Sequence, residues 1–364
     1  MLTKAAVVSE KGAPFQIKEV QLEGPRVGEV LIRLVGTGIC HTDLIVRDQQ
    51  FPVQLPAVLG HEGSGVVEKV GEGVTGIEQG DHVVLSYSSC GTCPSCHEGK
   101  TYACEHFFQL NFGGKMSDGT SRLKDEEGTL SHLFGQSSFS YYAVINARNV
   151  VKVPKDVPLE ILGPLGCGIQ TGCGAILNKL KPEPGSSVAV FGCGSVGLSS
   201  VMAAKVAGCT TIIAVDVYED RLELAKELGA THTINPKRED ALEAIMAITK
   251  KGVNYSLETS GVPQVLRQSV DCLAVSGTAA VIGAPPIGTE VSLDVKTIRQ
   301  ERTITGVVEG SGNPQVFIPK LIELYKQGQL PFDKLINFYS LEEINQACED
   351  AEKGICIKPV IKFN

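Results

Sequence analysis

The hydrophobic pattern of the chain changes near residue 188. Before that point, short apolar or alternating runs are separated by Gly and Pro at close intervals, which is typical of a small barrel-like β domain. After it, apolar runs alternate with stretches of helical periodicity, which predicts a doubly wound α/β sheet. The expected strands lie at 4–8, 16–22, 29–39, 64–71 and 81–86 in the first part and at 188–192, 211–216, 232–235, 255–261, 278–284 and 303–308 in the second.

Helical patterns fall between the later strands, for example at 195–206, 221–228 and 241–250. After residue 308 the chain has two more helical patterns, 315–326 and 341–353, and a closing strand over 357–363. We expect this last part to return to the first domain. The prediction is therefore a split domain, 1–168 and 309–364, around a second domain at 169–308.

The stretch from 188 to 221 carries a nucleotide-binding pattern. Gly192, Gly194 and Gly197 follow a buried strand in the spacing G-x-G-x-x-G, Ser195 opens the next helix, and Asp216 ends the following strand. The glycines permit a tight turn, close approach of the backbone to a pyrophosphate and close helix–strand packing, while the helix N-terminus offers free N–H groups. Asp216 can accept hydrogen bonds from a ribose and would repel a 2′-phosphate, which favours NAD over NADP.

The amino-acid composition excludes some classes of binding partner. With 33 Lys and Arg against 41 Asp and Glu, the formal net charge of −8 argues against a nucleic-acid or anionic-membrane surface. The N-terminal stretch has no signal-peptide pattern and no apolar run reaches transmembrane length, so we expect a cytoplasmic protein. In that compartment the twelve cysteines are metal ligands, reactive thiols or small core residues rather than disulfides.

One loop contains four cysteines in the spacing C-x2-C-x2-C-x7-C: Cys90, Cys93, Cys96 and Cys104. Four thiolates can close a tetrahedron around Zn²⁺ and leave no position for water, which predicts a structural zinc site. The alternatives are an iron–sulfur cluster, whose ferredoxin spacings are absent, and chance clustering.

Further motifs are spread along the chain and can be interpreted together with these two. The chain resembles the zinc-dependent medium-chain alcohol dehydrogenases through GTGICHTD, LGHEGSGVVEKVG, the cysteine loop, GCGIQTGCGA, GCGSVG and GICIKPVIKF, which together span essentially the whole sequence. The resemblance implies an α/β fold: a six-stranded parallel Rossmann domain, and a GroES-like β-barrel catalytic domain formed by 1–168 and 309–364. It also implies two zinc ions per subunit, one catalytic and one structural.

The resemblance assigns roles to particular positions. Cys40, His61 and Cys167 match the catalytic zinc ligands, and Asp43 matches the acid that orients the histidine. Glu62 matches an acidic residue behind the zinc that can take part in ligand exchange, its alternative role being that of a buried ion-pair partner. Thr42 matches the hydroxyl that binds the substrate oxygen. The implied cofactor contacts are His41 and Lys358 with the pyrophosphate, Thr171, Val196 and Val307 with the nicotinamide, and Arg221 with the adenosine ribose.

The implied reaction is oxidation of a primary alcohol by hydride transfer from a zinc-bound alkoxide to NAD⁺. Ile45 stands where many relatives have a histidine that ends the proton relay, so we expect the proton to leave through water or another residue. The resemblance extends to bacterial aryl-alcohol dehydrogenases, and the apolar or small positions near Phe51, Ser86–Tyr87, Leu110 and Leu133–Phe134 suit an aromatic or allylic alcohol. Geraniol-type alcohols and S-hydroxymethylglutathione are the alternative substrates.

The implied assembly is a homo-oligomer, a tetramer rather than a dimer, joined through the sheet edge at 277–285 and 303–308. Two other classes of protein carry cysteine or glycine motifs of this kind. A zinc-ribbon binding module would need a basic face that the acidic composition does not supply. A crystallin-like or quinone-reductase-like relative would lack the catalytic ligands, which are all present here.

Overall fold

The computed structural model describes residues 1–363 and divides into two compact units. Unit 1 comprises residues 1–168, 313–323 and 333–363, and unit 2 comprises Ile169–Gly312 and Leu324–Phe332. The expected boundary at 309 therefore differs slightly from the observed one, because residues 309–312 and 324–332 pack with unit 2.

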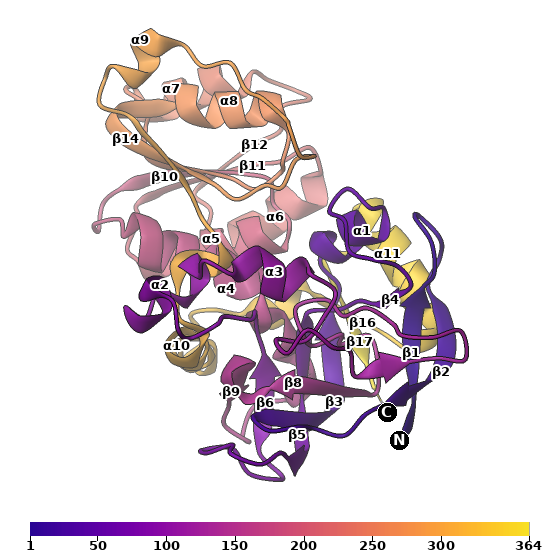
Figure 1. Cartoon of the computed structure of the whole chain (residues 1–364). Helices are drawn as coiled ribbons and strands as arrows, with labels where there is room; N and C mark the ends of the chain where they lie inside the picture. The colour runs from indigo at the N-terminus through magenta and orange to yellow at the C-terminus, as the bar shows by residue number, and fades with distance from the viewer. Residues whose placement is uncertain (364) are drawn as a thin grey trace. The chain divides into compact units, whose positions relative to one another are not determined.

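Unit 1 is built mainly from short antiparallel strands (Figure 1). One sheet has the order β4-β1-β2-β7 and a larger one the order β16-β17-β3-β5-β6-β9, with β8 pairing β3. The strands are β1 (Leu2–Val8), β2 (Gln16–Leu22), β3 (Glu29–Gly38), β4 (Ala57–Val58), β5 (Glu62–Val70), β6 (His82–Leu85), β7 (Leu123–Lys124), β8 (Tyr142–Asn146), β9 (Val150–Lys152), β16 (Ile336–Tyr339) and β17 (Lys358–Lys362). Its helices are α1 (His41–Arg47), α2 (Pro94–His97), α3 (Phe107–Phe112) and α11 (Ile344–Glu352), while α10 (Pro314–Lys326) runs into unit 2.

Unit 2 contains a six-stranded sheet of order β12-β11-β10-β13-β14-β15, parallel throughout. The strands are β10 (Ser187–Phe191), β11 (Thr211–Val215), β12 (His232–Ile234), β13 (Val253–Glu258), β14 (Leu273–Val281) and β15 (Thr303–Gly306). The helices are α4 (Gly168–Gly174), which continues as a π-helical segment to Leu180, α5 (Ser195–Val206), α6 (Glu219–Leu228), α7 (Ala241–Thr249), α8 (Pro263–Asp271) and α9 (Val295–Ile298). Figure 1 shows α5 and α6 on one face of this sheet and α7 and α8 on the other, which confirms the predicted doubly wound fold.

The pattern of apolar residues explains how deeply the strands of the two units are buried. β10 and β11 are almost wholly apolar and buried, as expected for strands covered on both faces by helices. In unit 1, by contrast, β2 alternates exposed and buried positions from Glu19 to Leu22, because one face meets solvent.

Several elements differ from the predicted ones. β14 begins at Leu273 rather than 278, and the strands β4, β7, β8, β9 and β16 were not expected. The helix expected at 341–353 starts as a 3₁₀ turn, and α11 begins only at Ile344. Glu343 caps that turn by accepting from the Ser340 backbone N–H at 2.8 Å.

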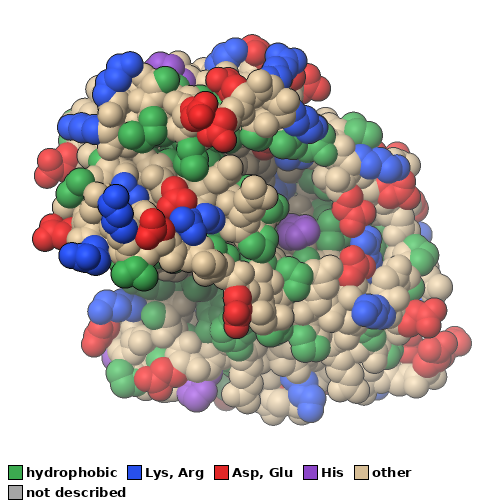
Figure 2. Space-filling model, turned by 90° about the horizontal axis from the view of Figure 1, so that it is seen from above, with side chains coloured by type: hydrophobic (Ala, Val, Ile, Leu, Met, Phe, Trp, Pro, Cys, Tyr) green, Lys and Arg blue, Asp and Glu red, His purple; other side chains and the backbone are tan. Residues whose placement is uncertain are grey.

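On the face drawn in Figure 2, basic and acidic side chains are interspersed rather than gathered in a track of one sign. Within residues 1–363, no helix combines the length and apolar character needed to cross a bilayer.

Candidate active site and cofactor site

Unit 1 brings together four side chains that lie far apart in the sequence. Cys40 precedes α1, His61 directly precedes β5, Glu62 is the first residue of β5, and Cys167 precedes α4. One ligand atom from each lies within 4.8 Å of the others, and all but the partly exposed Cys40 are buried. Two sulfurs, an imidazole and a carboxylate in this spacing form a donor set that suits Zn²⁺.

The carboxylate of Asp43 accepts hydrogen bonds from three groups in or beside this cluster. It is fully buried, and its Oδ1 accepts from His61 Nδ1 at 2.9 Å and from the Gly60 backbone N–H at 3.0 Å. Its Oδ2 accepts from the Cys40 backbone N–H at 2.9 Å. A proton on Nδ1 leaves Nε2 of His61 as the free acceptor, and this buried atom has no hydrogen-bond partner among residues 1–363. An orphaned imidazole nitrogen beside two thiols is what a metal ligand requires.

Charge in the cluster favours thiolate ligands. Hydrogen bonding with Cys167 outweighs burial and, with His61 and Lys358, holds the pKa of Cys40 well below its usual value. Burial alone would lower the pKa of His61, but the Asp43 carboxylate raises it well above the usual value, so a metal ion that binds at Nε2 would displace a proton. Burial likewise opposes the charge on Lys358, yet Glu62 raises the pKa of this ammonium group, so it remains protonated.

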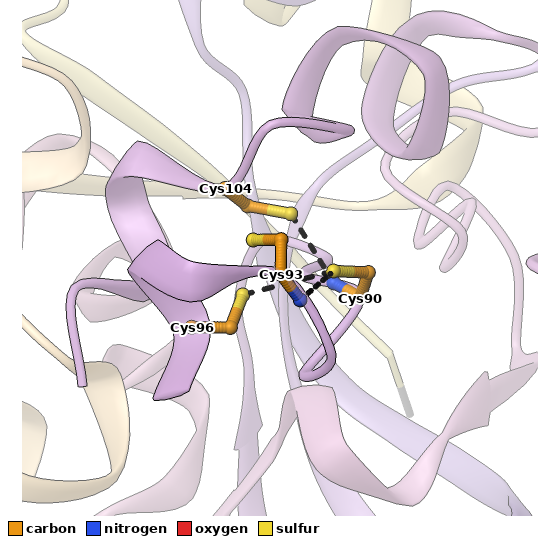
Figure 3. A group of neighbouring side chains, drawn as sticks. All are labelled: Cys90, Cys93, Cys96 and Cys104. Carbon is orange, nitrogen blue, oxygen red and sulfur yellow. Dashed lines mark hydrogen bonds between the residues drawn. The ribbon is translucent and has the colours of Figure 1, made fainter. Parts of the chain in front are cut away.

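The second cluster consists of Cys90, Cys93, Cys96 and Cys104, whose sulfurs also lie within 4.8 Å of one another (Figure 3). The Cys90 sulfur accepts from the backbone N–H groups of Thr92 and Cys93 at 3.4 and 3.3 Å. Burial opposes a charge there, but these donors lower the pKa of the Cys90 thiol to about 5. The Arg148 guanidinium also donates to the Cys90 carbonyl. Four sulfurs with no other donor type fit a closed structural zinc site.

The glycine turn of unit 2 has the geometry of a phosphate cradle. Gly192 has a φ of 92°, a Cβ on Gly194 would meet open space, and a Cβ on Gly197 would lie 1.8 Å from the Gly192 carbonyl oxygen. Ser195 opens the twelve-residue helix α5, and its buried Oγ has no hydrogen-bond partner within the described chain. The open space, the free hydroxyl and the helix N-terminus together fit a pyrophosphate.

Asp216 stands just past β11, at the carboxyl edge of the sheet. Its Oδ2 accepts from the Cys193 backbone N–H at 2.6 Å and its Oδ1 from the Tyr218 backbone N–H at 2.9 Å. Beside it lies a cavity of about 400 Å³ lined by residues including Gly192, Asp216, Val217, Ser260, Val262 and Gln264. This is the edge at which doubly wound sheets bind dinucleotides. Ser260 and Val262 were not predicted, although their place at the end of the expected strand 255–261 and just after it is a usable signal.

The comparisons with known proteins agree with this geometry. Residues 26–155 match the alcohol dehydrogenase GroES-like domain, and residues 195–327 match the zinc-binding dehydrogenase domain. The chain is 44% identical to a geraniol dehydrogenase of Castellaniella defragrans, over 99% of this chain and 97% of that protein. It belongs to the zinc-dependent medium-chain alcohol dehydrogenase family.

Two further relatives are similar to this dehydrogenase over its whole length. The crystal structure of benzyl alcohol dehydrogenase from Acinetobacter calcoaceticus has 53% sequence identity and a TM-score of 0.97, with all of both chains covered. An S-(hydroxymethyl)glutathione dehydrogenase of Paracoccus denitrificans is 37% identical over the full length of both chains. The predicted family and the predicted combination of a GroES-like and a Rossmann domain are therefore confirmed, as is a requirement for zinc and a nicotinamide cofactor.

Several predicted contacts of the dehydrogenase stay predictions. His41 is the exposed first residue of α1, Thr171 lies in α4, Val196 near the start of α5, and Val307 just after β15. Arg221 lies with its guanidinium carbon 4.8 Å from the centre of the Tyr218 ring. Lys358 differs most from its expected place, because it is buried and donates to both oxygens of Glu62 at 3.0 and 2.9 Å rather than standing free for a phosphate.

The predicted substrate positions separate into two groups. Leu110 faces a cavity of about 350 Å³ beside the four-cysteine loop. Phe134 instead stacks on the ring of His61, with centroids 4.6 Å apart. From Phe134 a chain of ring contacts leads outward, through Phe112 at 5.2 Å and Phe51 at a further 5.2 Å, to Phe108 at 6.3 Å. We call Phe51, Phe108, Phe112 and Phe134 the aromatic cluster. Its members Phe108 and Phe112 were missed, although their i, i+4 spacing in FFQLNF could have indicated them.

Proposed function

We propose that this dehydrogenase oxidises a primary aromatic alcohol of the benzyl alcohol type to the aldehyde, with NAD as cofactor. The aromatic cluster carries the proposal, because it leads from the proposed ligand His61 to Phe108, a residue that remains 66% exposed. Such rings favour a flat, conjugated substrate through offset stacking. The likeness to a benzyl alcohol dehydrogenase at 53% identity supports the same choice.

The proposed catalytic ligands are Cys40, His61 and Cys167, with Glu62 beside them, and the proposed structural ligands are the four loop cysteines. That makes two zinc ions per chain. A bound Zn²⁺ supplies Lewis-acid polarisation of an alcohol oxygen, and a bound NAD⁺ accepts a hydride. The cysteines and His61 fix where that chemistry takes place, and Asp43 fixes the imidazole tautomer.

Thr42 is proposed as the first proton carrier. Its Oγ1 lies 3.7 Å from Cys40 Sγ, so the hydroxyl stands beside the proposed ligands and can pass on a proton from the alcohol. Ile45, two residues after Asp43 in α1, is 5% exposed and cannot carry a proton further. We therefore propose that the proton leaves through water or through a residue outside α1.

The proposed preference for NAD rests on Asp216. Its two backbone hydrogen bonds hold the carboxylate at the end of β11, beside the unit 2 cavity. A fixed negative charge there accepts ribose hydroxyls and repels a 2′-phosphate.

The test of the substrate is NAD reduction with benzyl alcohol, geraniol, ethanol and S-hydroxymethylglutathione. Burying an aromatic ring contributes about 2–3 kcal/mol, so kcat/KM for benzyl alcohol is expected to exceed that for ethanol by about 100-fold. Phe51→Ala should reduce that ratio, whereas Phe338→Ala, at an exposed ring on β16, should not. A higher kcat/KM for S-hydroxymethylglutathione than for benzyl alcohol refutes the proposal, and a higher value for geraniol favours the terpene alternative, which the 44% identical relative supports.

We also propose a homo-oligomer, a tetramer rather than a dimer, formed through the edge of the unit 2 sheet. β15 is the last strand of that sheet, and apolar side chains remain exposed near it, Val275 at 66%, Val308 at 44% and Ile304 at 38%. The outer edge of a terminal strand beside exposed apolar residues is a natural site of association. Light scattering on the eluting protein tests this, and a monomer at micromolar concentration contradicts it.

A further inference from the structure

Helix α3 buries a polar side chain and exposes a phenylalanine. Within its sequence Phe-Phe-Gln-Leu-Asn-Phe, Asn111 is 1% exposed, whereas Phe108 is 66% exposed. The hydrophobic effect alone would favour the reverse arrangement, because a buried amide must find hydrogen-bond partners to offset its loss of water. The burial of Asn111 therefore needs an explanation that the apolar pattern does not supply.

Both N–H donors and the oxygen of the Asn111 amide meet backbone groups. Its Oδ1 accepts from the Ser88 N–H at 2.7 Å, and its Nδ2 donates to the Ser88 carbonyl oxygen at 3.0 Å and to the Phe107 carbonyl oxygen at 2.7 Å. An exchange of two hydrogen bonds with one backbone residue is also the pattern that pairs antiparallel strands, and it fixes both position and direction. The Asn111 amide thus joins α3 to the segment that follows β6.

The same two residues hold the backbone of Phe134. The Phe134 N–H donates to the Asn111 carbonyl oxygen at 2.8 Å, and the Ser88 hydroxyl donates to the Phe134 carbonyl oxygen at 2.9 Å. The Nδ2 of Asn149 in turn donates to Ser88 Oγ at 2.7 Å. Ser88, Asn111 and Asn149 are all buried, so these directional bonds are shielded from water.

The segments joined in this way carry three of the four rings of the aromatic cluster. Phe108 and Phe112 belong to α3, and Phe134 stacks on His61 while its ring centroid lies 5.2 Å from that of Phe112. Aromatic rings can pack in several offset or edge-on arrangements, so ring contacts alone do not fix where each ring stands. A helix as short as α3 is also not stable without tertiary contacts. The position of its two rings therefore depends on the Asn111 amide.

We propose that Asn111 is a positioning residue for substrate preference: its amide docks α3 against Ser88 and so places the aromatic cluster where the ring of an aromatic alcohol can stack. This proposal rests on the proposed function. It goes further by assigning the preference for a conjugated ring to a polar residue whose side chain bonds to backbone groups. An alcohol without such a ring gains nothing from the docking of α3.

The variant Asn111→Leu removes the amide but keeps a side chain of similar size, and it leaves the Ser88 N–H and carbonyl oxygen without this partner. With α3 displaced, kcat/KM for benzyl alcohol should fall by about tenfold, mainly through a higher KM, because part of the ring stacking is lost. The kcat/KM for ethanol should remain close to the wild-type value.

Hydrogen exchange of the full-length protein without substrate, followed by mass spectrometry, supplies a measurement independent of activity. The backbone amides of residues 107–113 should exchange about tenfold faster in Asn111→Leu than in the wild type, because local opening of α3 costs less free energy. If Asn111→Leu does not fold, Asn111→Ser takes its place, since its hydroxyl cannot make the two-bond exchange with Ser88.

The matched control is Asn345→Leu. In α11 the Asn345 side chain makes the same exchange with the backbone of Phe15, accepting from its N–H at 2.8 Å and donating to its carbonyl oxygen at 2.9 Å. Loss of this amide should lower the urea midpoint, as loss of the Asn111 amide does. It should leave the ratio of kcat/KM for benzyl alcohol to that for ethanol unchanged, which separates lost stability from altered substrate preference.

Three results overturn the proposal: an unchanged ratio of the two kcat/KM values in the Asn111 variant, unchanged exchange in residues 107–113, or an equal fall of the ratio in Asn345→Leu. A wild-type enzyme that shows no preference for benzyl alcohol over ethanol would instead refute the proposed function. The failure of this inference can therefore be distinguished from failure of the proposed function.

Discussion

Asp43→Asn should weaken metal binding without changing the shape of the site. The carboxylate accepts from His61, Gly60 and Cys40, and an asparagine can keep its oxygen on the side of the first two only by turning its NH₂ group toward the Cys40 N–H. One buried donor then loses its acceptor, at a cost of about 1–3 kcal/mol. Removing the partner of a ligating histidine typically costs about 10–100-fold in metal affinity.

Competition with a chromogenic chelator measures this change, because the zinc held by His61 should be released at a chelator concentration about 10–100-fold lower in the variant. Urea unfolding of the zinc-loaded protein should show a lower midpoint as well. The control is Asp48→Asn in the same region, where the lost partner is the side chain of Arg47 and the expected effect is below about 1 kcal/mol. A zinc affinity of Asp43→Asn within threefold of the wild type would show that the carboxylate does not orient the ligand.

Three other predictions concern separate parts of the molecule. Burial, with the nearby charge of Arg122, lowers the pKa of His132 to about 3 from 6.5. The contribution of the neutral imidazole to the free energy of unfolding is therefore present above pH 6.5 and is lost as the pH falls toward 3. His132→Gln should flatten the fall of the urea midpoint over this pH range, and an unchanged slope would contradict the reasoning. Cys104→Ser should lower zinc, measured by elemental analysis, from about two ions per chain to about one, while NADH fluorescence should still report binding, since the glycine turn and Asp216 belong to unit 2. Asp216→Ala should raise the NADP to NAD ratio of binding affinities by about tenfold or more, and equal losses for both cofactors would contradict a role in discrimination.

The fold of unit 2 could be predicted because its pattern is local. Each strand is a buried apolar run, each helix has its own periodicity, and the glycines mark the turn between them. β16 escaped prediction because its residues, Ile-Asn-Phe-Tyr, are exposed or half-buried and follow no clear alternation. The late start of α11 escaped it for a different reason, since a 3₁₀ turn and a helix share the same apolar spacing.

The site was predictable only in part. The four-cysteine loop is local, so its spacing indicates a metal directly. The other proposed ligands meet through tertiary structure, and resemblance to a family was needed to connect Cys40, His61 and Cys167. No sequence pattern could place Lys358 against Glu62, because that contact depends on the antiparallel pairing of β17 with β3, which joins Val360 to Gly38.

The pairing of β17 with β3 also affects how this enzyme is assembled. The Lys358–Ile39 hydrogen bond spans 319 residues of sequence, and the whole of unit 2 lies between its ends. Contacts of such long range form slowly, because the intervening chain must first be brought together. The proposed metal site is thus complete only when β17 has docked, and loss of that strand would leave the buried carboxylate of Glu62 without the ammonium group that neutralises it.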